Sequence, residues 1–144
     1  MLSQKTRYAL RSLLYLAERN DGLPIQLTEI AATQQVPRKY LELIMLDLKK
    51  AGMVKSRRGP GGGYVLARPA NDITFGEVIR TLDGPLALVP CASLTGYRRC
   101  EDCHDEATCA IRHVMAMVRQ DTAKVLDGTS LAQAAVLEGA LEAA

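Results

Sequence analysis

The chain has 144 residues, a formal net charge of +2 at pH 7 and only 4% aromatic residues. This length suits one domain, alone or with an oligomerisation arm. A core without Trp must be built from aliphatic side chains and Met, which favours helices. The first apolar run, at 13–17, is too short for a signal-peptide core or a membrane span, so we expect a cytoplasmic protein with no membrane segment.

The charge is distributed unevenly along the chain. Residues 48–70 contain six cations and no Asp or Glu, whereas residues 120–144 contain four acids and one Lys, a net charge of −3. The six cations are Lys49, Lys50, Lys55, Arg57, Arg58 and Arg68. This local excess of positive charge favours a polyanion-binding surface in the middle of the chain.

Three helices are predicted before residue 52. Apolar residues at helical spacing predict a helix over 3–19, which is ended by Asn20, Asp21, Gly22 and Pro24. A short helix fits 28–34 and a third fits 38–51, with a buried stripe of Leu41, Ile44, Met45 and Leu48. Two helices joined by a turn of a few residues, the second beginning with Arg38, Lys39 and Tyr40, match the helix-turn-helix pattern of DNA-binding proteins.

Residues 53–58 and 63–67 are predicted to form a two-stranded hairpin, the wing, around a glycine-rich tip. The tip places the guanidinium groups of Arg57 and Arg58 beside backbone without side chains, at Gly61 and its neighbours, which allows close approach to phosphates or to a minor groove. A simple tight turn with solvated arginines is the alternative, but the preceding helix-turn-helix favours a DNA contact. A nucleotide-binding loop is disfavoured because no Lys-Ser/Thr follows the glycines.

After a linker at 69–72, the pattern Thr74-x-x-Glu77 predicts a capping box that starts a short helix reaching about Leu82. Residues 83–105 are predicted to be a cysteine-rich sensor loop. Residues 106–144 are predicted to hold a dimerisation helix and a C-terminal helix. The apolar stripe of the dimerisation helix consists of Ile111, Val114, Val118 and Val125. Little of the domain is left to cover this stripe, which favours a homodimer over packing on its own domain.

All four cysteines, Cys91, Cys100, Cys103 and Cys109, lie between 91 and 109. In a reducing compartment such a cluster favours metal binding or redox chemistry over structural disulfides. Thiolates suit iron-sulfur clusters and zinc, but a four-cysteine zinc site usually draws on two close pairs, and only Cys100 and Cys103 form one. We therefore expect an iron-sulfur cluster, with zinc and a metal-free thiol redox switch as alternatives. His113, four residues after Cys109 on a helix, is a further candidate ligand.

Several strings resemble the IscR/NsrR-type (Rrf) family of bacterial winged helix-turn-helix transcriptional regulators. They are Leu2-x5-Tyr8-Ala9-Leu10, Tyr40-Leu41-Glu42, and Val54-x-Ser56-x-Arg58-Gly59-Pro60-Gly61-Gly62-Gly63-Tyr64, followed by the cysteine-rich region. The resemblance covers nearly the whole chain. It implies a homodimeric transcription factor, usually a repressor, whose DNA affinity depends on an iron-sulfur cluster beside the dimerisation helix. It also implies DNA contacts by Lys39, Tyr40, Glu42 and Arg58.

The candidate ligands depart from the family pattern. Cluster-binding relatives commonly show C-x5-C-x5-C, and here only Cys103-x5-Cys109 keeps that spacing. One branch of the family takes a His three residues after its last cysteine as a ligand, and another takes an acidic residue just before the first-helix Tyr; these positions are Arg112 and Arg7. We predict that Cys91, Cys103 and Cys109 bind a [2Fe-2S] or [4Fe-4S] cluster, with Cys100 or His113 as the fourth ligand.

The predicted fold is mainly α with a small β-hairpin wing, in which residues 1–82 form the DNA-binding domain. The predicted function is a DNA-binding regulator that senses iron, redox, nitric oxide or sulfur status. Its expected partners are double-stranded operator DNA, met by Arg38, Lys39, Tyr40, Glu42, Arg57, Arg58 and Gly61, and a second copy of the chain. A regulator with a thiol switch and a zinc-stabilised DNA-binding module without sensing are the alternatives. An enzyme is disfavoured because no Ser-His-Asp or paired-carboxylate arrangement is visible.

Overall fold

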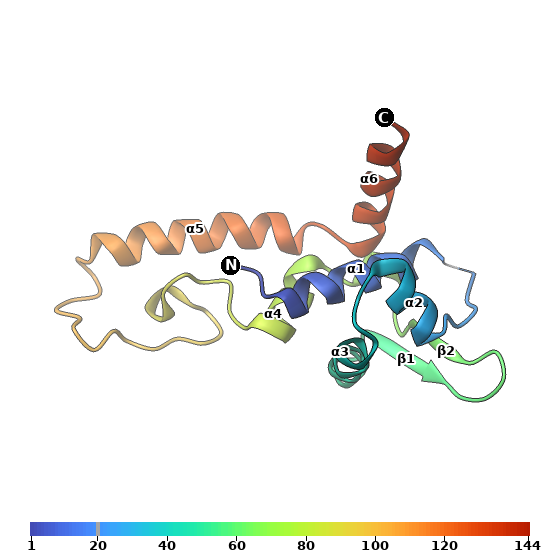
Figure 1. Cartoon of the computed structure of the whole chain (residues 1–144). Helices are drawn as coiled ribbons and strands as arrows, with labels where there is room; N and C mark the ends of the chain where they lie inside the picture. Colours follow the sequence, from blue (N-terminus) through green and yellow to red (C-terminus); the bar gives the residue numbers. More distant parts are fainter. Residues whose placement is uncertain (20) are drawn as a thin grey trace.

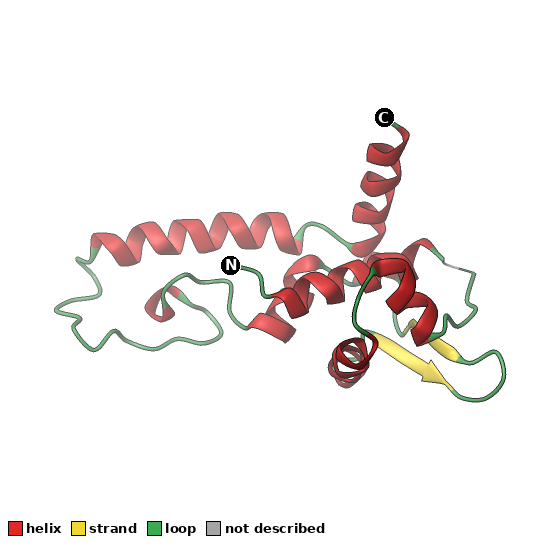
Figure 2. Ribbon diagram, viewed as in Figure 1, coloured by secondary structure: helices red, strands yellow, loops and turns green. Residues whose placement is uncertain are grey.

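The computed structural model describes residues 1–19 and 21–144, so the helix-ending role predicted for Asn20 lies outside the described residues. The described chain is mainly helical with one two-stranded antiparallel sheet, which confirms the predicted fold class (Figure 2). In chain order the elements are α1 (Gln4–Glu18), α2 (Leu27–Gln34), α3 (Arg38–Lys50), β1 (Val54–Arg57), β2 (Gly63–Leu66), the 3-10 turn η1 (Ala70–Asp72), α4 (Phe75–Asp83), the 3-10 turn η2 (Pro90–Ala92), α5 (Ala110–Asp127) and α6 (Leu131–Ala143).

The elements form a compact group and a long arm (Figure 1). Helices α1 to α3 and the hairpin gather at one end, while α5 runs as a long helix beside α4 and the loop that follows it. Helix α6 turns away from α5 and packs against α1 and η1 with its first turn. The cysteine-containing loop therefore lies far along the arm, away from the hairpin.

The core lies between α1, α2, α3 and the first strand. The stripe predicted on α3, from Leu41 to Leu48, is fully buried, and it meets Ala9 and Leu13 of α1. Spacing of three and four residues puts these side chains on one face of each helix. Burial of each leucine or isoleucine contributes about 1.5–3 kcal/mol, so this face fixes how α3 is presented to solvent.

The turn between α2 and α3 is built on Gln35, whose φ of +54° is in the left-handed region. The N–H of Val36 then donates to the Ala31 carbonyl at 3.0 Å, which closes the end of α2. The hairpin that follows pairs Val54 with Leu66 and Arg57 with Gly63. Helix, turn, helix and hairpin thus stand in the predicted order.

The capping box predicted at Thr74 forms only in part. The Thr74 hydroxyl accepts the Glu77 N–H at 3.2 Å, but the Glu77 carboxylate pairs with Arg68 at 2.5 Å instead of returning to the backbone of Thr74. The carboxylate is drawn to a guanidinium because a charged partner is stronger than a neutral amide. The complete capping box of this structure is instead at Ser130 and Gln133, at the start of α6.

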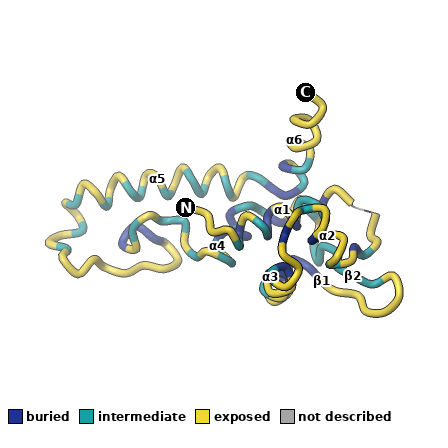
Figure 3. The backbone as a smooth tube through the Cα atoms, viewed as in Figure 1, coloured by how far each residue is buried: buried dark blue, intermediate teal, exposed yellow. Residues whose placement is uncertain are grey.

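Helix α6 belongs to the predicted segment 106–144 but packs on the DNA-binding domain. Its Leu131 is fully buried in the core of the DNA-binding domain, and the backbone of Thr74 pairs with that of Ser130. Helix α5, by contrast, has no buried residue (Figure 3). No described helix is both long and apolar enough to cross a membrane.

Candidate functional site

Helix α3 presents charged side chains on the side opposite its buried stripe. Arg38, Lys39 and Glu42 are exposed, and the Arg38 and Glu42 side chains pair weakly, with 3.7 Å between the closest charged atoms. This pair is solvated on both sides, so a phosphate or a base can displace it at little cost. Tyr40 is different: its ring is half-buried and packs edge-on against Tyr8, with 5.8 Å between ring centroids.

The wing tip carries its two arginines into solvent. Arg57 and Arg58 are exposed and form no ion pair with any residue that the structure describes. The base of the wing is held at two points. Lys49 of α3 donates to the Ser56 hydroxyl at 2.9 Å, and Tyr64 exchanges backbone hydrogen bonds of 2.8 and 2.9 Å with Ile25. The wing and α3 therefore form one basic surface of fixed relative position.

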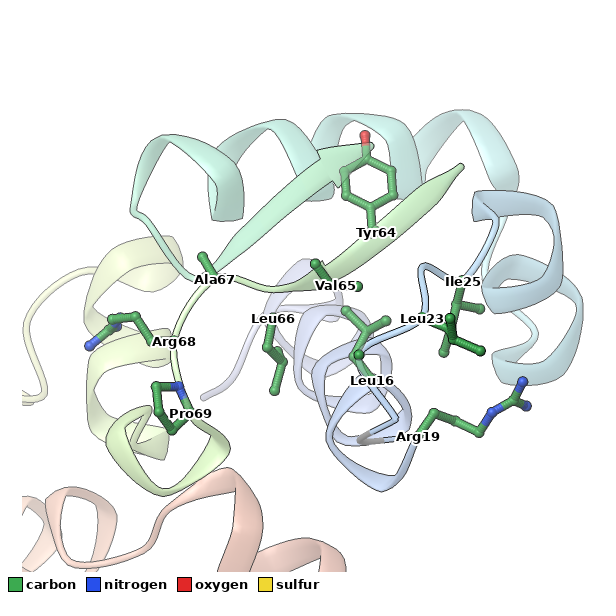
Figure 4. Close-up of a pocket in the computed structure, with 11 residues that line it drawn as sticks. Leu16, Arg19, Leu23, Ile25, Tyr64, Val65, Leu66, Ala67, Arg68 and Pro69 are labelled. Carbon is green, nitrogen blue, oxygen red and sulfur yellow. The ribbon is translucent and has the colours of Figure 1, made fainter. Parts of the chain in front are cut away.

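A cavity of about 270 Å³ separates the wing from α1 (Figure 4). Its lining is mixed in polarity and includes Leu16, Ile25 and Leu66 together with Arg19 and Arg68. This volume is below that of most small-molecule sites, which are about 300–1,000 Å³. We interpret it as a packing gap beneath the hairpin.

The four cysteines line a single cavity of about 500 Å³ at the start of α5. Cys91 is buried in η2, and its Sγ accepts a weak hydrogen bond from the Cys100 thiol at 3.8 Å. That contact is the largest of the causes that raise the pKa of Cys100. A backbone hydrogen bond from Cys103 to Cys100 brings the second pair together, and Cys109 caps α5 by accepting the Arg112 N–H at 3.5 Å.

The two histidines take different positions. His104 is exposed but lines the cysteine cavity. His113 lies outside the lining, and its Nε2 is 2.9 Å from the Ala107 carbonyl oxygen. The structure therefore brings the four cysteines to one cavity and leaves the alternative fourth ligand, His113, turned to the backbone of the loop. The ligand set remains a prediction.

Two arginines of α5, which sequence reasoning did not single out for contacts, hold η2 against the helix. Arg112 Nε donates to the Cys91 carbonyl at 3.1 Å, and Arg119 donates to the Ala92 carbonyl at 2.5 Å. Arg112 also lies 3.3 Å from the buried Glu106 Oε2, which forms no hydrogen bond to a described group. The other Glu106 oxygen accepts the Tyr97 hydroxyl at 2.5 Å, which raises the pKa of Tyr97. The spacing of seven residues puts the two arginines on one helix face, but it does not identify the backbone carbonyls that they bind.

The cavity fits an iron-sulfur cluster in the kind and number of donors, because four thiols surround it. Among the described residues, no three His, Cys, Asp or Glu side chains converge closely enough to hold a metal ion. Cys91 itself is already fixed to α5 by the Arg112 hydrogen bond to its carbonyl.

Helix α5 exposes most of its predicted apolar stripe. Ile111 is 67% exposed, Val125 is 65% exposed and Val114 is 51% exposed, and Met117 between them is also exposed. A row of exposed aliphatic side chains along an 18-residue helix, interrupted at Asp121, is a typical protein interaction surface.

Comparison with known proteins agrees with this architecture. The Rrf2 family, described as iron-dependent transcriptional regulators, matches residues 2–136. An Rrf2-like HTH-type transcriptional regulator of Rhodobacter capsulatus is 43% identical over 134 residues, which are 91% of this chain and 89% of that protein.

Two solved regulators are similar to the whole chain. CymR, the global cysteine regulator of B. subtilis, has a TM-score of 0.79 and 35% identity, covering 95% of this chain and 97% of its own. IscR of T. potens has a TM-score of 0.76 and 32% identity, covering 99% of this chain and 90% of its own. These relatives are transcriptional regulators rather than enzymes, as the sequence predicted. The chain therefore belongs to the Rrf2 family of winged-helix transcriptional regulators.

Proposed function

We propose that this regulator is a homodimeric repressor whose operator affinity is controlled by an iron-sulfur cluster bound between Cys91 and Cys109. The observation that carries the proposal is the convergence of all four cysteines on one cavity, at the end of the helix with the exposed apolar stripe. Cys91, Cys103 and Cys109 would hold the cluster with Cys100, whose Sγ lies 3.8 Å from that of Cys91. The bound cluster would supply a redox-sensitive and iron-dependent centre. The protein supplies the thiolates, the fixed position of Cys91 and the shielding of one side by η2.

A chain of polar contacts connects the cavity to the DNA-binding surface. Arg112 and Arg119 join η2 to α5, and Asp127 at the end of α5 accepts two hydrogen bonds from Arg80 of α4, at 2.7 and 2.9 Å. On α4, Glu77 pairs with Arg68 at the foot of the wing. A shift of α5 relative to α5 of the second subunit would therefore move α4 and, through α4, the wing.

The last residue of α4 also contacts the first helix. Asp83 accepts the Ser3 hydroxyl at 2.5 Å and the Ser3 N–H at 3.0 Å, while Lys5 of α1 pairs with Asp47 of α3 at 2.5 Å. Both routes end at elements that carry the expected DNA contacts. Two half-sites about one helical turn apart fit only one spacing of two recognition helices, so a cluster that selects one arrangement changes affinity.

The ligand assignment is tested by anaerobic purification of Cys91→Ala, Cys103→Ala and Cys109→Ala, with His113→Ala as the matched control. Each cysteine variant is expected to lose most of its iron and visible absorbance, while the control keeps both. Zinc is measured on the same samples. If all three cysteine variants keep a wild-type iron-to-protein ratio, the ligand assignment fails. A colourless wild-type protein with stoichiometric zinc would instead indicate a structural zinc site in place of the proposed cluster.

Control by the cluster is tested separately, by the operator affinity of cluster-loaded and cluster-free protein at one stated salt concentration. Salt must be held fixed because phosphate contacts make affinity strongly salt-dependent. We expect at least a tenfold difference in Kd. Equal affinity would retain a DNA-binding regulator but overturn the sensing mechanism.

A second candidate is a thiol redox switch, favoured by the 3.8 Å separation of the Cys91 and Cys100 sulfur atoms. These two thiols would lose two protons and two electrons to a peroxide, which is reduced to water and an alcohol or a second water as the disulfide forms. This candidate predicts colourless, iron-free protein whose mobility on non-reducing gels shifts with peroxide in the wild type and not in Cys100→Ala.

A further inference from the structure

Two leucines stand on the outward face of α3, where a recognition helix meets DNA. Leu43 is 58% exposed and Leu46 is 48% exposed. They are three residues apart, so they adjoin each other on the helix surface, and they lie opposite the buried stripe that begins at Leu41. Lys39, four residues before Leu43, and Lys50, four residues after Leu46, continue the same face in both directions.

The free protein gives no packing reason for these two side chains. The core face of α3 is complete without them, because Leu41, Ile44, Met45 and Leu48 are all fully buried. A single exposed leucine is ordinary on a protein surface. Two adjacent ones between lysines, on the helix that faces the expected ligand, are better explained by contact with that ligand.

The charge around the leucines indicates what the ligand is. Lys39, Lys49 and Lys50 are exposed on α3, and Arg57 and Arg58 are exposed on the adjoining wing, whereas Glu42 is the one exposed acid that α3 presents in the described structure. An apolar protein partner would have to bury these cations. A duplex satisfies both kinds of group, since phosphates accept the cations while the floor of the major groove offers one apolar group, the 5-methyl of thymine.

We propose that Leu43 and Leu46 read thymine methyl groups in the major groove and thereby determine part of the operator sequence. The inference rests on the proposed function, because it requires α3 to enter DNA. In this arrangement the lysines set the depth of insertion, and the two leucines discriminate A·T pairs from G·C pairs by burying methyl groups. Each half-site then contains one thymine in contact with Leu43 and one with Leu46.

The experiment uses the full-length cluster-loaded protein and DNA selected from a random duplex pool at one salt concentration. Each enriched thymine is then replaced by deoxyuridine, which removes only the methyl group and leaves base pairing intact. For the wild type we expect a loss of roughly fourfold in affinity per contacted methyl, the fold-change that follows from the transfer of one methyl-sized group out of water. Leu43→Ala and Leu46→Ala should each bind more weakly and become insensitive to loss of the methyl they contact.

Leu137→Ala is the matched control, because Leu137 is also 58% exposed but lies on α6. It should keep the wild-type response to deoxyuridine. If the pool yields an enriched sequence but deoxyuridine weakens the wild type and both α3 variants equally, the methyl readout is overturned while DNA binding stands, and the leucines become a surface for a protein partner. If no sequence is enriched, the proposed function itself fails.

Discussion

Gly63 is the wing residue with the least room for a side chain. A Cβ there would lie 2.3 Å from the Ile25 carbonyl oxygen, and its φ of +149° is one that L-residues rarely adopt. Gly63→Ala should therefore break the pairing of the wing with Ile25 and destabilise the protein by about 2–3 kcal/mol. Urea unfolding measures the loss, and operator affinity should fall with it.

Gly61→Ala provides the comparison, because Gly61 has a positive φ of +73° but open space around it. It should cost only about 1 kcal/mol, the penalty for a left-handed L-residue. Equal destabilisation by the two substitutions would show that backbone conformation, rather than the close approach to Ile25, limits residue 63.

The Arg80–Asp127 pair gives a pH-dependent prediction. The hydrogen bonds from Arg80 hold the pKa of Asp127 below its ordinary value of 3.8 despite opposing desolvation. A carboxyl with a lowered folded-state pKa stabilises the fold above that ordinary value, and the contribution is lost as the pH falls through the folded-state pKa.

Asp127→Asn should thus reduce the free energy of unfolding at pH 7, and this reduction should shrink progressively as the pH falls below 3.8. Both side chains are about one-third or more exposed, so solvent screening keeps the effect below about 1 kcal/mol. Asp121→Asn, on the same helix and without an ion pair among the described residues, is the control. A difference from wild type that stays constant between pH 7 and pH 2 would contradict the assignment.

For single residues, the sequence predicted which side chains belong to the candidate site better than it predicted the contacts that they make. The four cysteines were recognisable as one cluster because thiols are rare and their spacing is short. The role of Arg112 was not predictable, since its partner, the Cys91 carbonyl, is 21 residues away and has no side-chain signature. Backbone acceptors carry no sequence signal, so contacts of this type emerge only from the fold.

Leu41 and Leu43 of α3 have different roles, although they are only two residues apart in the sequence. Leu41 is fully buried, whereas Leu43 is 58% exposed. Leu41→Ala should destabilise the protein by about 2–5 kcal/mol through lost burial and a cavity. Leu43→Ala should change stability by less than about 0.5 kcal/mol. Thermal unfolding of the two variants tests this contrast, and a large loss for Leu43→Ala would mean that the outward face is packed in solution.

The existence of each helix was predictable because its signals are local. Apolar spacing, Thr74 at the start of α4 and Ser130 at the start of α6 are all within a few residues of the structure they determine. The partners of α4 were not predictable, since Arg80 and Asp127 are 47 residues apart. Even the local capping box at Thr74 was altered by a tertiary partner, the guanidinium of Arg68.

For the whole molecule, the exposed face of α5 predicts dimerisation. Val114→Asp would place a charge in the middle of the proposed apolar interface and should raise the dimer Kd at least tenfold, about 1.4 kcal/mol. Sedimentation equilibrium at several concentrations measures the change. Gln120→Asp, an added charge at an exposed polar position of the same helix, should leave the dimer intact. A monomeric wild type at micromolar concentration would contradict the proposed assembly.

The overall order of domain, loop and helix could be predicted because each segment has a distinct composition. The attachment of α6 to the DNA-binding domain could not, because an Ala-rich helix gives no sign of which surface receives Leu131. The predicted boundary at residue 106 marks a change in amino-acid composition. Helix α6, which follows this boundary, packs against α1 and η1, which precede it.

The attachment of η2 to α5 affects the entropy cost of assembling the proposed cluster. Arg112 and Arg119 already hold the backbone carbonyls of Cys91 and Ala92, so one wall of the cavity is ordered before any ligand arrives. Each residue that remains to be ordered costs about 1–2 kcal/mol of conformational free energy, and that cost now falls on the segment from Cys100 to Cys109. We therefore expect that the proposed cluster would assemble and be lost through movement of residues 100–109, while η2 and Cys91 stay in place.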